Sequence, residues 1–192
     1  MALLTLLFGL QNVSRTTFFP NPNEETTMKP SIRLALASLA TTALLISAPT
    51  FAQTGPAPYG APITMEQAQK VMTAAEAEAR KNNWGVVIAI VDSGGHMVAL
   101  HRLDAQTASI EIATGKATTA AAFRRPSKAL EDGLAAGGAG LRILSVRSAT
   151  PLQGGVPIIV DGKIIGAIGV SGVTAAQDEV VAMAGAAAAA AK

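Results

Sequence analysis

Cysteine is absent from this 192-residue chain, histidine occurs only twice, and aromatic residues make up 4% of the sequence. Without cysteine the chain can form no disulfide, no thiolate nucleophile and no sulfur-based metal site. The remaining polar residues show neither zinc-ligand spacing nor a Ser-His-Asp order. The fold must therefore be stabilised by its apolar residues, which account for 49% of the chain.

Charge is also sparse, with 15% charged residues and a formal net charge of +2. No basic stripe with interleaved aromatic residues occurs, so nucleic acid is not an expected partner.

Residues 28–52 show the pattern of an export signal. Residues 28–33 form a short basic opening, residues 34–47 form an apolar run without charge, and small residues precede a cleavage site after Ala52. This pattern predicts a signal peptide over 28–52 and a periplasmic or secreted protein. The apolar run is shorter than the about 20 residues that a spanning helix needs, so we expect no stable membrane insertion after cleavage. Residues 1–27 have no role in this scheme, and we interpret them as a mis-assigned upstream extension.

The rest of the chain has the length of one domain. Residues 53–62 are rich in proline, glycine and alanine, which predicts a flexible linker. Residues 63–192 then form a single domain. Its first helix is predicted to begin at a capping box, Thr64 to Gln67, and to run to about Asn82. The apolar residues that share one face of this helix are Ala68, Val71, Met72, Ala75 and Ala79.

A predicted hairpin over residues 86–104 contains both histidines. Its first strand is apolar on both faces, which is typical of a central strand covered on both sides. Gly94 and Gly95 are expected to supply the positive φ of the tight turn. His96 and His101 lie on the second strand.

Further helices are predicted over 108–123, 127–136 and 174–192, with a loop and a short irregular element over 137–150. A second hairpin joins strands 156–160 and 163–171. The latter strand has one small face, so we expect an element to pack tightly over Ala167 and Gly169. The order α-β-β-α-α-β-β-α predicts an α+β domain, with two β-hairpins forming one antiparallel sheet flanked by helices.

Five short motifs, in the order given in the next sentence, resemble the GlcG/HbpS family. This is the haem-binding or haem-degrading domain that is also found at the C-terminus of PduO-type proteins. The motifs are Val91-Asp92-x-x-Gly95-His96 leading to Arg102-Leu103-Asp104, Lys116-Ala117-x-Thr119, Gly154-Gly155-x-Pro157, Gly166–Gly172, and Asp178-Glu179. The resemblance spans residues 64–187. It implies a profilin-like or roadblock-like fold, assembly into a homo-oligomer, and haem as a ligand. It also implies a haem contact for Thr119.

The two histidines are the candidate ligands of haem iron. They are five residues apart on a strand, so their side chains point to opposite faces and cannot hold one ion within a single copy. His96 has the alternative of an exposed turn residue, because it follows two glycines. His101 has the alternative of a hydrogen-bonded core or interface histidine.

Anion-binding groups form a second candidate set. Arg102 can clamp a carboxylate or pair with Asp104. Lys116 shares a helix face with Thr119, suited to a porphyrin edge and its propionates, or it forms a surface ion pair. The amides of Ser171 and Gly172 precede the last helix and offer an anion site, or they are capped in the ordinary way.

Three functions remain open from the sequence. The first is an exported, homo-oligomeric protein that binds haem or a related tetrapyrrole. The second is an enzyme or accessory protein that acts on a small carboxylate, with one of the histidines moving a proton. The third is an oligomeric scaffold without a ligand. The scarcity of aromatic residues favours a surface or interfacial haem site over a deep pocket.

Overall fold

The computed structural model describes residues 55–190. The predicted upstream extension, the signal peptide and the start of the linker lie outside this range. The elements, in chain order, are α2 (Met65–Lys81), β1 (Val87–Asp92), β2 (Met97–Arg102), α3 (Ser109–Phe123), α4 (Lys128–Ala135), the 3-10 helix η1 (Gly138–Ser145), β3 (Gly155–Val160), β4 (Lys163–Ser171) and α5 (Ala175–Ala188).

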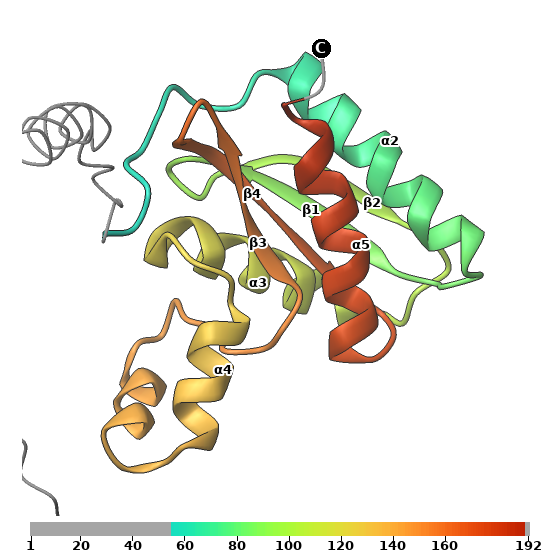
Figure 1. Cartoon of the computed structure of the whole chain (residues 1–192). Coiled ribbons are helices and arrows are strands. Elements are labelled where there is room, and N and C mark those ends of the chain that lie inside the picture. Colours follow the sequence, from blue (N-terminus) through green and yellow to red (C-terminus); the bar gives the residue numbers. More distant parts are fainter. Residues whose placement is uncertain (1–54, 191–192) are drawn as a thin grey trace, which may run out of the picture. The chain divides into compact units, whose positions relative to one another are not determined.

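Two β-hairpins form one antiparallel sheet in the order β2-β1-β4-β3 (Figure 1). The hairpins join through β1 and β4, whose register runs from Val87 opposite Ser171 to Asp92 opposite Gly166. The predicted α+β fold is confirmed, including the central position of β1, whose residues Val87–Val91 are all buried.

Helices cover both faces of the sheet. On one face α2 and α5 pack side by side, and their buried residues form a core with Ile88, Ile90 and Ile168. On the other face α3 packs against β4, β1 and β3. The buried residues of α2 are the five whose helical spacing predicted its inner face.

The predicted close packing over the small face of β4 is confirmed, and the packing element is α3. A Cβ atom added to Gly169 would lie 2.5 Å from the backbone nitrogen of Ala117 and would overlap the carbonyl oxygen of Ala113. Backbone therefore rests on backbone at this point, which explains why both elements carry small residues here.

The structure differs from the sequence-based expectations in two loops. Residues 58–63, expected within or beside a flexible linker, are hydrogen-bonded to β4. Gly60 donates to the carbonyl of Ile164 at 2.8 Å, and the Tyr59 hydroxyl donates to the carbonyl of Ala121 at 2.8 Å. At the β1–β2 turn only Gly95 has a positive φ, at 84°, so the expectation of a positive φ for Gly94 is wrong.

The helices α4 and η1 pack on each other and have no buried residue of their own, so they project from the body of the domain (Figure 1). Among the described residues, no helix has the length and apolar character needed to cross a membrane.

Candidate functional site

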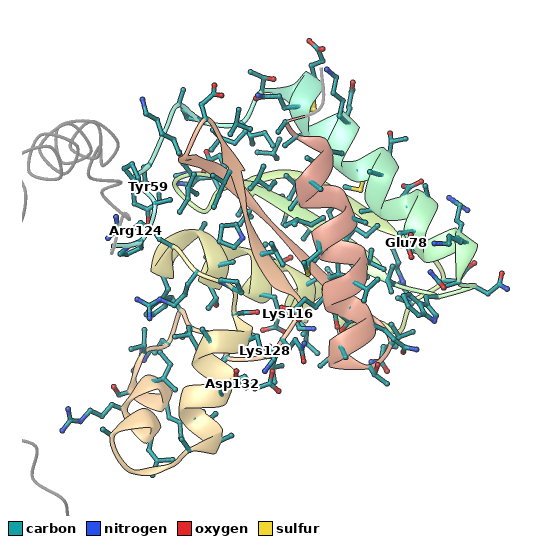
Figure 2. The ribbon with its side chains drawn as sticks, in the orientation of Figure 1. Tyr59, Glu78, Lys116, Arg124, Lys128 and Asp132 are labelled. Carbon is teal, nitrogen blue, oxygen red and sulfur yellow. The ribbon has the colours of Figure 1, made fainter. Side chains whose placement is uncertain are left out.

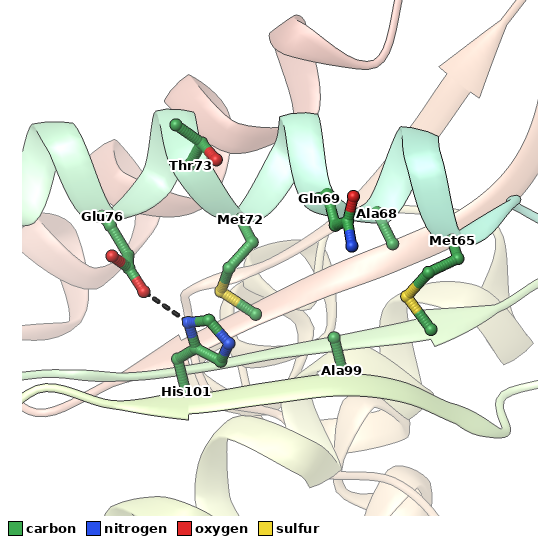
Figure 3. Close-up of a pocket in the computed structure, with 8 residues that line it drawn as sticks. All are labelled: Met65, Ala68, Gln69, Met72, Thr73, Glu76, Ala99 and His101. Atoms are coloured by element: carbon green, nitrogen blue, oxygen red, sulfur yellow. Dashed lines mark hydrogen bonds and ion pairs between the residues drawn. The ribbon is translucent and has the colours of Figure 1, made fainter.

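His101 and Glu76 form a hydrogen-bonded pair of ionisable side chains at the surface. His101 lies on the edge strand β2, Glu76 lies on α2 above it, and the imidazole Nδ1 contacts the carboxylate Oε1 (Figure 3). The hydrogen bond from His101 is the main reason that the pKa of Glu76 is lowered below its ordinary value. An ionised carboxylate only accepts hydrogen bonds, so Nδ1 is the donor in this pair and Nε2 is the ring nitrogen left for a further partner.

A groove between α2 and β2 surrounds this pair. Its volume is about 210 Å³, and every residue that lines it comes from these two elements (Figure 3). The lining residues are Met65, Ala68, Gln69, Met72, Thr73, Glu76, Ala99 and His101. The His101 side chain is 54% exposed, and no hydrogen bond within residues 55–190 engages its Nε2. The groove thus combines apolar walls, two thioethers and one imidazole nitrogen able to bind a metal.

His96 lies elsewhere, at the β1–β2 turn. Its side chain is 82% exposed, and its Nδ1 lies 3.3 Å from the Asp92 carboxylate. Asp92 also accepts hydrogen bonds from the backbone amides of Gly94 and His96, and the latter is the main reason that its pKa is lowered. The structure therefore places His96 as an exposed turn residue and does not bring it together with His101.

Lys116 is buried rather than exposed on a ligand-facing helix surface. Its Nζ donates to the Asp178 carboxylate at 2.8 Å and to the Val170 carbonyl at 2.9 Å, with both charged side chains 3% exposed. Figure 2 shows Lys116 where α3 approaches the beginning of α5. Burial raises the pKa of Asp178, and the hydrogen bond from Lys116 opposes this rise. The pair links the helices on the two faces of the sheet.

Gly154 and Gly155 leave room for this buried lysine. A Cβ atom on Gly154, which has a φ of 120°, would lie 3.0 Å from the Lys116 Nζ, and one on Gly155 would overlap the Lys116 carbonyl. The Gly-Gly pair is therefore explained by close packing around Lys116.

Thr119 and Arg102 also have partners within the chain. Thr119 is fully buried, and its hydroxyl accepts a 2.8 Å hydrogen bond from the Thr150 amide, which attaches the segment after η1 to α3. Arg102 donates from Nε and Nη2 to the Ala105 carbonyl, at 2.8 and 2.5 Å, and closes the loop after β2. Its predicted alternative, an ion pair with Asp104, does not occur among the described ion pairs.

The amides before α5 are capped by the chain itself. The Val173 amide donates to the Asp178 carboxylate at 3.2 Å, and Gly172 donates to the same carboxylate from its backbone. Ser171 is buried and donates to the Ser109 hydroxyl at 3.3 Å. The predicted anion site at Ser171 and Gly172 thus already holds a carboxylate, that of Asp178.

Sequence reasoning missed Glu76, and it placed Asp178 in a family motif without identifying its partner Lys116. Glu76 follows Met65, Gln69 and Met72 at steps of three or four, so the spacing alone places it on the groove side of α2. The spacing does not reveal His101 as its partner. No group of three or more histidine, aspartate or glutamate side chains that could hold a metal ion occurs within residues 55–190.

Comparison with known proteins gives a consistent result. A family model described as "Haem degrading protein HbpS-like" matches residues 63–187. Protein GlcG of Escherichia coli K12 is 44% identical over 110 residues, which cover 57% of this chain and 81% of that protein. An uncharacterized 15.0 kDa protein from the dhaT-dhaS intergenic region of Citrobacter freundii is 38% identical over 125 residues, covering 64% of this chain and 88% of that protein.

Solved structures share the fold. The HbpS crystal structure superposes with a TM-score of 0.62 at 31% identity, covering 74% of this chain and 97% of that chain. The PduOC:heme complex superposes with a TM-score of 0.61 at 29% identity, covering 66% of this chain and 94% of that chain. Klebsiella pneumoniae ORFY, of family DUF336, has a TM-score of 0.64 at 29% identity, covering 72% of this chain and 97% of that chain.

Proposed function

We propose that this chain, which belongs to the HbpS-like family of haem-degrading proteins, binds haem or a related tetrapyrrole in the groove between α2 and β2. The observation that carries the proposal is the hydrogen bond from His101 Nδ1 to Glu76, which leaves Nε2 available in an apolar groove. Metal-binding histidines commonly donate their second ring nitrogen to a carboxylate, which fixes the tautomer and makes the other nitrogen a better ligand.

The groove residues suit a porphyrin face in two respects. Haem, when bound, would supply an iron that accepts imidazole as a ligand, and His101 is the side chain that would hold it. Met65 and Met72 supply flexible, polarizable side chains that adapt to a flat apolar surface. Glu76 would orient the imidazole and would itself stay off the iron.

The size of the groove supports binding at the surface. Its volume of about 210 Å³ is below the about 300–1,000 Å³ of pockets that enclose a drug-sized ligand. A tetrapyrrole would therefore be covered on one side only by a single copy. This is consistent with the scarcity of aromatic residues.

Export and assembly form part of the proposal. The signal-peptide pattern over residues 28–52 supports a periplasmic or secreted protein. A binding site that one copy covers only in part supports a homo-oligomer.

The small-carboxylate alternative has weaker support, because its proposed anion-binding groups are already engaged. Lys116 pairs with Asp178, Arg102 with a backbone carbonyl, and the amides around Gly172 with the Asp178 carboxylate. None of these residues lines the groove that contains His101.

A haemin titration that follows the Soret band tests the proposal. The wild-type protein is expected to give a saturable shift, and His101→Ala is expected to lose at least tenfold in affinity because it lacks the axial ligand. His96→Ala is the matched control, since it removes the only other imidazole from an exposed turn. Equal affinity of wild type and His101→Ala, or a non-saturating response in all three proteins, would overturn the proposal.

A further inference from the structure

A second cavity, the Trp84 cleft, lies where the loops after α2 and after β2 meet. Its volume is about 450 Å³, within the about 300–1,000 Å³ of pockets that hold small molecules. The residues that line it are Arg80, Asn83, Trp84, Gly85, Leu103 and Asp104. None of them lines the groove that contains His101, so the Trp84 cleft is a separate cavity.

Backbone contacts between the two loops hold the cleft in shape. A Cβ atom added to Gly85 would lie 3.1 Å from the carbonyl oxygens of Leu103 and Asp104. The Leu103 amide donates to the carbonyl of Val86 at 2.7 Å, which joins the loops again one residue further on. Trp84 and Leu103 are half-buried and pack against the hydrophobic core. The cleft is therefore formed before any ligand arrives.

The Trp84 side chain has an unused hydrogen-bond donor. Within residues 55–190 every buried side-chain nitrogen or oxygen has a hydrogen-bond partner, whereas the Trp84 indole nitrogen has none, so this nitrogen is open to solvent. Trp84 thus offers a ligand in the cleft both an apolar ring and a free N–H donor.

Two opposite charges border the cleft, and no ion pair joins them among the described residues. The Arg80 side chain is 65% exposed, and its partner is Glu76 at 3.4 Å. A pair this exposed contributes little, so a carboxylate in the cleft can replace it. Asp104 is exposed, and no hydrogen bond or ion pair within residues 55–190 engages its carboxylate.

The backbone does not account for the polar side chains of Asn83 and Asp104. Both residues have a left-handed conformation, with φ values of 56° and 52°. Glycine adopts this conformation with the least strain. The two polar side chains are therefore left with the cleft as the place where they can bind something.

We propose that the Trp84 cleft binds an apolar α-amino acid in its zwitterionic form. The Arg80 guanidinium and the Trp84 N–H hold the carboxylate, and the Asp104 carboxylate holds the ammonium group. The Trp84 ring and Leu103 contact the apolar side chain of the ligand. A simple anion would be repelled by Asp104 and a simple cation by Arg80, whereas a zwitterion is attracted by both.

The fluorescence of Trp84, the single tryptophan, reports binding directly. Leucine is expected to give a saturable change. N-acetyl-leucine lacks the ammonium group and leucine amide lacks the carboxylate, so each is expected to bind about tenfold more weakly or worse. No response to leucine, methionine or phenylalanine, or equal affinity for leucine and N-acetyl-leucine, would overturn the proposal. Saturable binding of methyl glucoside in place of leucine would also overturn it, by assigning the cleft to a sugar.

Substitutions at the two charges test the role of each. Asp104→Asn should lose about tenfold or more in leucine affinity and should no longer discriminate against N-acetyl-leucine. Arg80→Gln should lose a similar factor and should no longer discriminate against leucine amide. A variant that merely folds poorly would not change its preference in this way. Unchanged leucine affinity in both variants would refute the proposal.

Matched controls lie close by in sequence or in conformation. Lys81→Gln removes the cation next to Arg80 on α2 but outside the cleft. Asp161→Asn alters a carboxylate with a similar φ, 50°, in the turn between β3 and β4. Both should bind leucine as wild type does, and losses equal to those of Arg80→Gln and Asp104→Asn would contradict a specific site.

The proposal does not depend on haem binding, and His101→Ala keeps the two sites apart. This variant should bind leucine with unchanged affinity, because His101 does not line the Trp84 cleft. Loss of leucine binding in His101→Ala would place the amino acid in the other groove and overturn the proposal. Saturable leucine binding by a protein that fails to bind haemin would support the Trp84 cleft and overturn only the proposed function.

Discussion

Replacing Lys116 by methionine is expected to destabilise the fold more than any exposed charge substitution. Methionine keeps the length of the side chain and removes its charge. The Asp178 carboxylate would then be left buried without its cation, and the Val170 carbonyl would lose the hydrogen bond at 2.9 Å. Both charged side chains are 3% exposed, so water cannot replace the lost partner. Breaking a buried pair in this way costs about 3–5 kcal/mol of unfolding free energy.

The loss is large relative to the stability of a domain, which is about 5–15 kcal/mol. Urea unfolding followed by the fluorescence of Trp84, the single tryptophan, measures it directly. With a slope of about 1–3 kcal/mol per molar urea, the midpoint should fall by more than about 1 M. Lys128→Met is the control, because Lys128 pairs with Asp132 on the surface of α4 (Figure 2) and its loss should change the midpoint little.

The pH dependence of the stability loss shows whether the buried charge of Asp178 causes it. Burial raises the pKa of Asp178, and Lys116 opposes that rise. Without Lys116 the pKa of Asp178 should rise further. A group with a raised pKa in the folded state stabilises the fold when it is protonated, and this stabilisation is lost as the pH increases through that pKa. The Lys116→Met protein should therefore lie closer to wild type at pH 4 than at pH 7.

A double variant gives the remaining check. Lys116→Met combined with Asp178→Leu removes both charges, and replacing a buried pair by apolar residues is often neutral. The double variant should thus be more stable than Lys116→Met alone. The reasoning is refuted if Lys116→Met unfolds within about 1 kcal/mol of wild type at pH 7, since an uncompensated buried charge costs more than that.

Three further predictions follow from single contacts. Glu76→Ala should weaken haemin binding about 10–100-fold, because it removes the partner that orients His101. Titration should show no such loss for Glu78→Ala, two positions further along α2, and equal losses would contradict a positioning role for Glu76. Gly169→Ala should lower the free energy of unfolding by about 1–3 kcal/mol or more, because the added methyl group overlaps the α3 backbone. Gly133→Ala, which adds a methyl group in open space on α4, should raise it by up to about 1 kcal/mol, as measured by thermal unfolding. Tyr59→Phe should lower the free energy of unfolding by about 0.5–1.5 kcal/mol in the same assay, because it removes the hydrogen bonds of the hydroxyl to the end of α3. No change would mean that this hydroxyl does not contribute to stability.

Much of the fold could be predicted because it rests on short-range patterns. The spacing of Ala68, Val71 and Ala75 defines the inner face of a helix whatever packs against it. The alternation around Ala167 and Gly169 likewise predicts a tightly packed strand face. Such periods depend on local geometry, so a sequence reveals them before any tertiary contact is known.

The site could be predicted only in part because its contacts join distant positions. Glu76 and His101 are 25 positions apart, and Lys116 and Asp178 are 62 positions apart. Periodicity indicates which face of an element a residue occupies and does not indicate the partner on another element. Lys116 was expected at a ligand surface or in a surface ion pair, because it shares a helix face with Thr119. Charged residues are seldom fully buried, and the Asp178 carboxylate is what makes the burial of Lys116 tolerable here.

The hydrogen bonds on the two faces of the sheet support the proposed location of the ligand site. On the α3 face, the polar groups of Lys116 and Thr119 are fully engaged, so a ligand there would have to break buried hydrogen bonds before forming its own. On the α2 face, the Glu76 carboxylate uses only one nitrogen of His101, and the groove beside it is already exposed. A ligand that binds Nε2 gains a metal bond without displacing any interaction seen in residues 55–190. The cost of binding therefore favours the α2–β2 groove, although the resemblance first drew attention to Thr119 on α3.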